Sequence, residues 1–336
     1  MQKEVVQLSP TVFGEQIDRE TILSHLKSES DLFRQYTKLT PELRNDFLDY
    51  CSGNRGIKIT YDTFFKYVFD PERTPERLSA FISCLLGKEV HVKYALPLEG
   101  SQIIEEGSLV VMDIIVELED GSLANVEIQK LPYLFPGERS ACYSSDLVLR
   151  QYASVKSQKK KGFKYGDLKT VYTIVILEKS TEEFHKFPKD FIHKSRQIFD
   201  TGLELHLLQE FLYVPLDIFL ESGHTIDTEA DAWLKFLTSD EPKVIMEIIT
   251  KFPSFIPLYK DIFEFRQDIK EVLHMYSKAL EEMDRNTIKY MIDLQKEEIE
   301  KQKEELEKLK EESDKQKREN EQLRQQLEEL RKKQKE

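Results

Sequence analysis

The sequence predicts an α/β protein in which a mixed sheet is flanked by helices, with helical additions and a C-terminal coiled coil. Two observations predict it. Between about residues 61 and 180, apolar patterns of helical and strand period follow one another in the order α-β-β-β-α-β. From residue 288 onward, Glu, Lys, Gln, Arg and Leu dominate and form a heptad repeat. We therefore expect an N-terminal helical segment (1–60), the α/β core (61–220), a helical cover (221–287) and a coiled coil (288–336).

The composition indicates a soluble globular chain. Its 336 residues are 40% apolar, which is enough for a substantial core. No apolar stretch approaches the roughly 18 to 20 uncharged residues of a membrane-spanning helix, and residues 1–10 lack the pattern of a signal peptide. Cys51, Cys84 and Cys142 have neither a disulfide framework nor a zinc-ligand spacing. We expect a cytoplasmic protein with reduced thiols and no membrane partner.

The net charge of −13 resides almost wholly before the C-terminal tail. Residues 284–336 contain 15 Lys and Arg against 16 Asp and Glu, so the preceding 283 residues carry a net charge of −12. This excludes nucleic-acid binding through a general positive field. If the core binds DNA, it uses a local basic patch, metal ions that neutralise carboxylates, or a partner.

Local signals place the elements of the first 180 residues. Thr40 can cap a helix, Pro41 suits its first position, and Gly53 ends it. In the core, Gly87 ends a further helix. The expected core helices lie at 74–86 and 137–157, and the expected strands at 90–96, 109–118, 122–130 and 170–177.

The remaining residues are expected to be mostly helical. One more strand is expected at 211–214, ended by Pro215, and an amphipathic helix at 231–237 contains the single tryptophan, Trp233. In the tail, polar seam residues weaken the middle of the coiled coil but set its register, so we expect a parallel homodimer. A single solvated helix is the alternative. The seam consists of Ile292, Ile299, Leu306, Ser313, Asn320 and Leu327 at a, and Gln295, Gln302, Leu309, Gln316, Leu323 and Leu330 at d.

The most informative stretch is a β-hairpin at residues 110–130. Its turn, Glu119-Asp120-Gly121, fits a three-residue loop in which a type I turn precedes a glycine with positive φ. This loop makes the numbers of each cross-strand pair sum to 240 and places Asp113 opposite Glu127. A two-residue turn would mix polar and apolar residues on both faces, so the alternation of side chains selects the first register.

The predicted register separates an apolar face from a polar face. The polar face collects Asp113, Glu117, Asn125, Glu127 and Gln129 among Val111, Ile115 and Leu123. The apolar face, suited to the core, holds Val110, Met112, Ile114, Val116, Leu118, Ser122, Ala124, Val126 and Ile128.

Two carboxylates that face each other repel, at a cost of up to about 1 kcal/mol when exposed and more when buried. A divalent cation relieves this repulsion, and Mg²⁺ takes one or two carboxylates together with water. Asp113 and Glu127 are therefore candidate metal ligands, and the backbone carbonyl of Ile128 is a third. The alternative is a hairpin with one solvated acidic face.

These residues resemble a known family. Asp113, a hairpin, and then Glu127-Ile128-Gln129 in an α-β-β-β-α-β order resemble the PD-(D/E)XK nuclease superfamily and its restriction-endonuclease-like core. The closer resemblance is to the PD-(D/E)XK family transposases, relatives of the recombination-promoting nucleases, and covers about residues 55–180. It is carried by YDTFFK at 61–66, Met112-Asp113, and NVEIQK at 125–130.

The resemblance implies a Mg²⁺-dependent DNA endonuclease with Asp113 and Glu127 as metal ligands. Gln129 stands where the superfamily has a lysine, and a glutamine can hydrogen-bond the attacking water but brings no positive charge. The transposase-like branch resembles this Glu-x-Gln form. Methionine rather than proline precedes Asp113, which has no chemical consequence.

The helix after the hairpin carries candidate substrate contacts. Arg139, Tyr143, Asp146 and Arg150 form one stripe, with Gln151 beside it. The family places this helix beside the metal site, so Arg139, Tyr143, Arg150 and Gln151 are candidate phosphate contacts, and a solvated stripe is the alternative. Lys66 and Lys130 are further candidates, although Lys130 points to the opposite face of a regular strand. The lysines at 156, 159, 160, 161 and 164 either grip phosphates or keep a loop soluble.

The resulting prediction is a Mg²⁺-dependent DNA endonuclease of a mobile element, active in DNA recombination, in which Asp113 and Glu127 hold the metal and Gln129 places the water. The alternative is a catalytically weak or inactive domesticated nuclease fold that acts as a nucleic-acid-binding or coiled-coil scaffold module.

Overall fold

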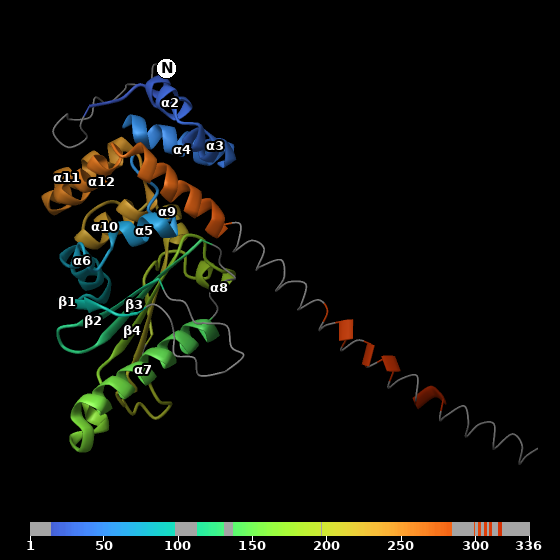
Figure 1. The fold of residues 1–336 in the computed structure, drawn as a ribbon. Coiled ribbons are helices and arrows are strands. Elements are labelled where there is room, and N and C mark those ends of the chain that lie inside the picture. Colours follow the sequence, from blue (N-terminus) through green and yellow to red (C-terminus); the bar gives the residue numbers. More distant parts are fainter. Residues whose placement is uncertain are drawn as a thin grey trace, which may run out of the picture. The chain divides into compact units, whose positions relative to one another are not determined.

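The computed structural model describes residues 15–97, 113–130, 137–195 and 197–283, together with separate positions between 299 and 317 (Figure 1). The contacts divide the chain into two units, residues 1–280 and residues 281–336. The divisions expected within the first unit remain predictions. In the part of the chain that is described, no helix has the length and apolar character needed to span a bilayer.

The N-terminal segment contains helices α2 (Arg19–Ser28), α3 (Ser30–Lys38) and α4 (Pro41–Ser52). The start and end predicted for α4 are confirmed. The Thr40 hydroxyl accepts a hydrogen bond of 3.3 Å from the Leu43 N–H, and Gly53 adopts the left-handed conformation with φ +79°. These two signals were local, so the sequence was sufficient to place them.

The core follows the predicted order α-β-β-β-α-β. Gly87, with φ +72°, ends the first core helix as expected. Of the strand expected at 109–118, residues 109–112 lie outside the described part of the chain. The elements are α5 (Asp62–Val68), α6 (Pro75–Leu86), β1 (Val92–Ala95), β2 (Ile114–Leu118), β3 (Leu123–Gln129), α7 (Gly137–Lys159) and β4 (Val171–Leu177).

The remainder of the first unit adds strands and a helical cover. The strand expected at 211–214 is part of a longer strand that ends at Pro215, and the helix expected at 231–237 is confirmed. Residues 269–283 are also helical. The elements are α8 (Glu182–His185), β5 (His193–Lys194), β6 (Gln209–Pro215), α9 (Leu216–Glu221), α10 (Glu229–Thr238), α11 (Pro242–Lys251) and α12 (Ile256–Phe265), with 3₁₀ turns η2 (Lys160–Gly162), η3 (Tyr165–Asp167) and η4 (Pro253–Phe255).

The strands form one mixed six-stranded sheet in the order β1-β2-β3-β4-β6-β5. Strands β1, β2 and β3 form an antiparallel meander, whereas β3, β4 and β6 run parallel, and β5 pairs with β6 in the antiparallel sense. The parallel step from β3 to β4 requires a crossover, which α7 supplies. The carboxyl ends of β3, β4 and β6 therefore meet at one edge.

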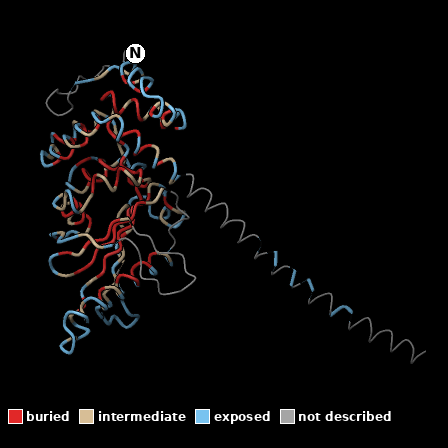
Figure 2. Tube along the Cα trace, viewed as in Figure 1, coloured by how far each residue is buried: buried red, intermediate tan, exposed pale blue. Residues whose placement is uncertain are grey.

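The two faces of the sheet are buried against different helices, as the buried residues in Figure 2 indicate. The face predicted to be apolar, which includes Ile114, Val116 and Val126, joins the large core beneath α5, α6 and the helical cover. The opposite face packs under α7, where Ile115 and Leu123 contact a smaller cluster (Figure 1). The predicted assignment of faces is confirmed, and the polar face is covered by a helix rather than by solvent.

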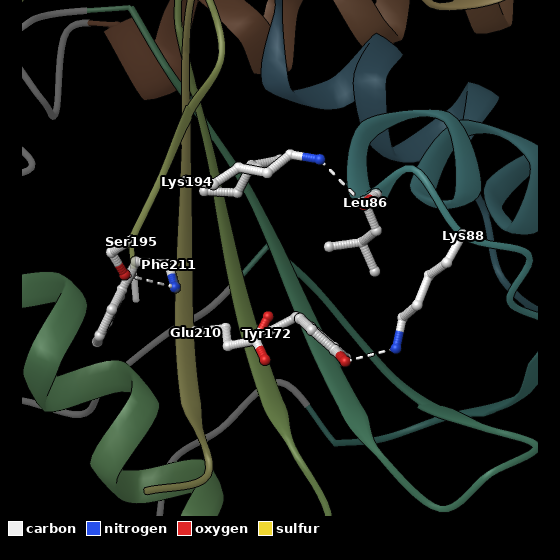
Figure 3. A pocket seen from close by; sticks show the side chains of 8 residues that line it. Leu86, Lys88, Tyr172, Lys194, Ser195, Glu210 and Phe211 are labelled. Atoms are coloured by element: carbon white, nitrogen blue, oxygen red, sulfur yellow. Dashed lines mark hydrogen bonds between the residues drawn. The ribbon is translucent and has the colours of Figure 1, made fainter. Parts of the chain in front are cut away.

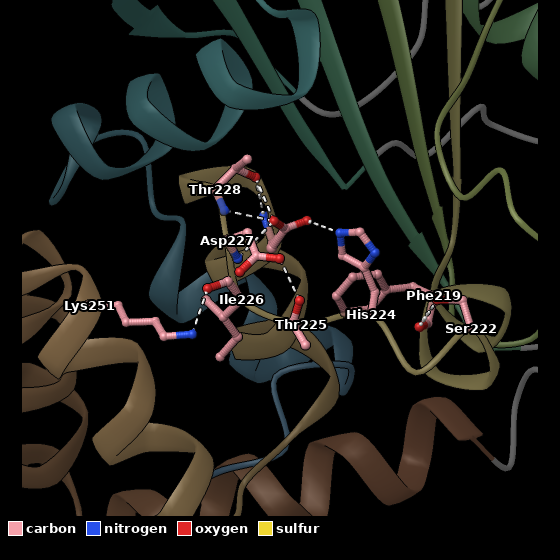
Figure 4. A network of polar contacts seen from close by, with 9 residues as sticks. Phe219, Ser222, His224, Thr225, Ile226, Asp227, Thr228 and Lys251 are labelled. Atoms are coloured by element: carbon pink, nitrogen blue, oxygen red, sulfur yellow. Dashed lines mark hydrogen bonds and ion pairs between the residues drawn. The ribbon is translucent and has the colours of Figure 1, made fainter.

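A polar network anchors the helical cover at the start of α10 (Figure 4). The Asp231 carboxylate accepts hydrogen bonds from the backbone N–H (2.7 Å) and hydroxyl (2.8 Å) of Thr228, which in turn caps the helix. His224 Nε2 lies 3.0 Å from the other oxygen of Asp231. This capping box satisfies the first turn of the helix, so the cluster has a structural role.

Most of the heptad positions of the second unit lie outside the described residues. Ile299, Leu306 and Leu309 are described, helical and 51%, 54% and 65% exposed on the isolated chain. The coiled coil and its parallel dimer therefore remain predictions.

Candidate metal and phosphate site

The hairpin has the register that the sequence predicted. Ile114 pairs with Val126 and Ile115 with Asn125, so the numbers of each pair sum to 240. The Leu118 N–H donates to the Ser122 carbonyl at 2.8 Å, and Gly121 has φ +83°. A residue with a Cβ is rarely stable at this φ, so the glycine allows the three-residue loop that sets the register.

The carboxyl groups of Asp113 and Glu127 each accept a hydrogen bond from the backbone of the opposite segment. The Asp113 N–H donates to Glu127 Oε1 at 3.1 Å, and the Ile128 N–H donates to Asp113 Oδ2 at 3.0 Å. Asp113 precedes the first residue of β2, and Glu127 lies near the end of β3. The two carboxyl groups are thus held side by side, as the register predicted.

Burial makes the ionised form of both groups unfavourable. Glu127 is only 1% exposed; burial raises its pKa well above the ordinary value, and the charge of Asp113 raises it further. Burial likewise raises the pKa of Asp113 to about 6, and the charge of Asp62 adds to this effect, whereas Lys66 opposes it. A buried and a half-buried carboxyl with raised pKa values form a site where a cation is stabilising.

Lys66 of α5 brings a positive charge to this pair. Its ammonium lies 3.1 Å from Asp113 Oδ1 and 2.9 Å from Asp62 Oδ2. Burial would lower the pKa of Lys66, but the charges of Asp113 and Asp62 together raise it. The ammonium therefore remains charged beside the pair. The Asp62–Lys66 pair was not singled out from the sequence, although its i,i+4 spacing on a helix was the available signal.

The N-terminal end of α7 provides two further groups. Arg139 Nε donates to the Tyr143 hydroxyl at 2.8 Å, and Tyr143 is 5% exposed. Burial raises the pKa of Tyr143, Arg139 lowers it, and Glu127 raises it, so the ring lies within electrostatic reach of the carboxyl pair. The guanidinium and phenol are thus placed where a phosphate at the pair would meet them.

The sheet face beneath α7 is polar around Glu127. The hydroxyls of Thr173 on β4 and Ser144 on α7 are fully buried, and neither has a hydrogen-bond partner within the described part of the chain. Thr173 lies directly beside Asn125 in the parallel register. Buried hydroxyls with unused hydrogen-bonding capacity are typical of sites that take up water or a ligand. The environment of Glu127 therefore fits a hydrated cation.

Three predicted substrate contacts lie away from the pair. Lys130 is on the opposite face, where its ammonium sits 3.4 Å from the centre of the Tyr61 ring and 3.8 Å from Glu178; burial lowers its pKa to about 8. Arg150 pairs with Asp146 at 2.7 Å and donates to the Pro97 carbonyl at 2.6 Å.

Gln151 bridges two backbone segments, since its amide nitrogen donates to the Gly121 carbonyl at 3.2 Å and its oxygen accepts from the Lys169 N–H at 2.7 Å. The stripe on α7 is therefore divided. Its N-terminal end reaches the carboxyl pair, and its C-terminal end contacts the turn of the hairpin.

A sequence profile of the PD-(D/E)XK nuclease family transposases matches residues 59–289, about two thirds of the chain. This span includes the hairpin, α7 and the whole sheet. The chain belongs to this family. Comparisons with the curated proteins and with the solved structures gave no significant match.

In the PD-(D/E)XK superfamily motif, a lysine follows the glutamate by two positions, and this chain has Gln129 there. Alternation along β3 places Gln129 on the face of Glu127, and its backbone carbonyl accepts a hydrogen bond of 2.8 Å from the Glu178 N–H. The only cation within 4.0 Å of either carboxyl of the pair, among the described residues, is Lys66. This family member therefore brings its nearest positive charge from α5.

Two other polar clusters of this PD-(D/E)XK chain do not have the chemistry of a hydrolytic site. In a cavity of about 190 Å³ at the edge of α6, Lys88 donates to the Tyr172 hydroxyl and Lys194 to the Leu86 carbonyl, leaving Glu210 as its one carboxylate (Figure 3). Ser180, His185 and Asp217 also cluster, but the Ser180 hydroxyl donates to the Asp217 carboxylate at 2.9 Å, and His185 Nε2 lies 3.3 Å from both residues. In a serine-nucleophile triad the hydroxyl instead donates to the histidine, and the carboxylate binds the other ring nitrogen.

Across the described residues, no three His, Cys, Asp or Glu side chains are gathered as a metal-binding group. A cation at the pair would therefore take two carboxylates and complete its coordination with the Ile128 carbonyl and water. This is the ligand set that Mg²⁺ commonly accepts, whereas zinc prefers nitrogen and sulfur ligands.

Proposed function

We propose that this protein is a Mg²⁺-dependent DNA endonuclease of a transposase-like element, with Asp113 and Glu127 as the metal ligands and Ile128 contributing its carbonyl. The observation that carries the proposal is that the buried Glu127 carboxyl and the half-buried Asp113 carboxyl lie side by side, each bound by the backbone of the opposite segment. Membership of a nuclease family supports a nuclease-like function and DNA as the partner.

The ligand set and its surroundings support the choice of Mg²⁺. The set is composed of oxygen atoms only, and the Thr173 hydroxyl, which lies on the same face of the sheet as Glu127, has unused hydrogen-bonding capacity for the waters that Mg²⁺ retains. When bound, the cation lowers the pKa of a coordinated water and stabilises negative charge at the scissile phosphate. Side chains of the protein would orient the water and bind the phosphate.

Four side chains complete the proposed chemistry. Gln129 orients the attacking water through its side-chain amide. Lys66 supplies the positive charge that the superfamily lysine would bring, because its ammonium already lies beside Asp113. Arg139 and Tyr143 bind the phosphate and hold it in line with the water. Lys130, Arg150 and Gln151 lie elsewhere, and we assign them no contact with the scissile phosphate.

A second candidate function is a catalytically weak or inactive nuclease fold that binds nucleic acid or acts as a scaffold. The Lys66–Asp113 ion pair favours it, because this pair offsets part of the carboxyl repulsion without any metal. Gln129 also favours it, because a neutral amide brings no positive charge to the transition state. The two functions differ in whether the protein catalyses cleavage of DNA, so a cleavage assay separates them.

We further propose that the coiled-coil tail at 288–336 assembles the protein as a parallel homodimer in the cytoplasm. We also propose the order of domains before this tail: an N-terminal segment at 1–60, a nuclease core at 61–220 and a helical cover at 221–287. The exposed a and d residues Ile299, Leu306 and Leu309 support the first part, since apolar side chains at this spacing are stabilised by burial against a second helix.

The test is nicking of supercoiled plasmid in Mg²⁺ by the full-length protein and by Asp113→Asn and Glu127→Gln. The matched control is Glu210→Gln, which removes an exposed carboxylate from the same sheet. We expect both site variants to lose about 100-fold or more in rate and the control to keep its rate. Equal cleavage by all variants refutes the assignment of the metal ligands, and no cleavage by the wild type with Mg²⁺ or Mn²⁺ refutes the endonuclease proposal and leaves the second function.

A further inference from the structure

The C-terminal end of α7 and the turns after it concentrate positive charge in an acidic protein. Residues 150–169 contain seven Lys and Arg and one Asp, a net charge of +6 in a chain of −13. Lys156 and Lys159 lie in the last turns of the helix, where the helix dipole favours cations. The dipole does not explain Lys161, Lys164 and Lys169, which lie beyond the helix.

Three aromatic rings stand among these lysines. Tyr152 of α7 stacks on Tyr165 with ring centres 6.1 Å apart and an angle of 14°, and Phe163 packs edge-on against both at 5.4 Å. Tyr165 is 74% exposed, the largest fraction among the exposed large apolar side chains described. A loop kept soluble by lysines has no physical reason to present an aromatic ring to water. We name residues 152–169 the basic–aromatic tip.

The basic–aromatic tip is held in one conformation. Asp167 accepts a hydrogen bond of 2.8 Å from the Lys164 N–H and pairs with Lys159 at 2.7 Å. Gln151 fastens the Lys169 backbone to the hairpin turn at Gly121. A surface ordered in this way loses little conformational entropy when it binds a partner.

A groove of about 560 Å³ separates the basic–aromatic tip from β1 and β2. On the tip side it is lined by Lys159 and Lys169, and on the strand side by Lys93 and Tyr94. The one carboxylate of the strand side, Glu117, is already bound by Lys93 at 2.9 Å and by the Tyr94 hydroxyl. The groove therefore presents cations on both of its walls and an aromatic ring, Tyr94, on the strand side, and the exposed ring of Tyr165 stands outside it on the tip.

We propose that the basic–aromatic tip and its groove bind single-stranded DNA, with a base stacked on Tyr165 and phosphates on the lysines. Positive charge alone fits any polyanion, but exposed aromatic rings gain stacking energy only from bases that are not paired in a duplex. Both features occur together here. This inference rests on the proposed function for the choice of DNA, and it specifies the substrate as DNA with an unpaired segment.

The length of α7 sets the distance between the carboxyl pair and the basic–aromatic tip. Tyr143 lies at the carboxyl pair and Lys159 at the tip, and a helix rising 1.5 Å per residue separates them by about 24 Å. That distance corresponds to roughly seven nucleotide steps of 3.4 Å. A strand that leaves the carboxyl pair along α7 thus reaches the tip within one turn of a duplex.

The test is fluorescence anisotropy in EDTA, with a labelled 25-nucleotide oligo(dT), a 25-base-pair duplex and phosphatidylserine vesicles as competitor. We expect oligo(dT) to bind more tightly than the duplex. We expect Tyr165→Ala to weaken oligo(dT) binding by roughly 5- to 150-fold, the range for loss of one stacked base, and Tyr165→Phe to retain it. Phe187→Ala, which removes a 54% exposed ring elsewhere, is the matched control and should bind as the wild type does.

The lysines are tested by salt dependence. The triple variant Lys160→Gln, Lys161→Gln and Lys164→Gln should lower the slope of log K against log salt by about 2, at about 0.7 per phosphate contact on a single strand. Its control replaces three exposed lysines of other surfaces, Lys189, Lys260 and Lys270, and should leave the slope unchanged. All these side chains are exposed, so circular dichroism should show the same unfolding temperature for every variant.

Three results would overturn the inference: unchanged oligo(dT) binding by Tyr165→Ala, equal affinity for duplex and single strand, or displacement of oligo(dT) by vesicles that bind more tightly than it does. None of them bears on the carboxyl pair, because the assay contains no metal. Conversely, a protein that does not nick plasmid can still bind oligo(dT), so a negative plasmid assay does not change the result of the binding assay. The two proposals thus fail separately.

Discussion

The change Glu127→Gln should stabilise the metal-free protein while it abolishes the response to Mg²⁺. Glu127 is 1% exposed and faces the half-buried Asp113, so the wild type holds two acidic groups side by side with little access to water. Glutamine has the same shape, and its Oε1 can still accept the Asp113 N–H. The substitution therefore removes the unfavourable acidic group without opening a cavity.

The expected gain follows from this geometry. Opposed like charges on a sheet cost up to about 1 kcal/mol, and removal of strain at a functional site commonly yields 0.5 to 2 kcal/mol, so we expect about 1 to 2 kcal/mol. For a folded unit of this size, that raises the unfolding temperature by about 2 to 8 °C. Differential scanning calorimetry in EDTA measures the change directly.

Two comparisons make the experiment decisive. Asp231→Asn alters a buried carboxylate of 4% exposure whose oxygens accept hydrogen bonds from Thr228, so it should lower stability by about 1 to 2 kcal/mol. Mg²⁺ at 100 times its dissociation constant should stabilise the wild type by about 2.7 kcal/mol and the Glu127 variant hardly at all. A Glu127→Gln protein that unfolds below the wild type in EDTA, or that gains as much from Mg²⁺, refutes the reasoning.

Three further predictions follow from the same structure. Lys66→Met should lower the plasmid-nicking rate by about 100-fold, because it removes the ammonium that lies beside Asp113, and an unchanged rate would remove Lys66 from the mechanism. Gly53→Ala should cost about 2 kcal/mol or more in urea unfolding, since φ is +79° and its Cβ would lie 1.7 Å from Arg266, whereas an intact midpoint would contradict this packing. Deletion of residues 288–336 should lower the mass in light scattering from that of two full chains to that of one shortened chain, and an unchanged number of chains per particle would leave the tail a single helix.

Much of the candidate site could be predicted from the hairpin alone. The three-residue loop and the alternation of side chains placed Asp113 beside Glu127 and assigned both faces correctly. Both signals are local, because a strand changes face at every residue and a turn needs particular residues at fixed positions. The helix caps at Thr40, Gly53 and Gly87 were predictable for the same reason.

The helix stripe on α7 was predictable only in part. Its spacing placed Arg139, Tyr143 and Arg150 on one face, and the structure confirms that Tyr143 and the Asp146–Arg150 pair turn toward the sheet. Yet residues on one face of a long helix lie far apart along its axis. Only Arg139 and Tyr143, at the N-terminal end of the helix, reach the carboxyl pair, which periodicity does not reveal.

What the sequence by itself determined is therefore the secondary structure, the hairpin register and the family to which the chain belongs. What only the tertiary structure decided is which groups surround the two carboxyls: Lys66 from α5, Tyr143 from α7, and the buried hydroxyl of Thr173 from β4. These groups come from segments distant in the chain, and their meeting depends on how helices pack over a sheet. Sequence patterns report short-range geometry, and packing determines the rest.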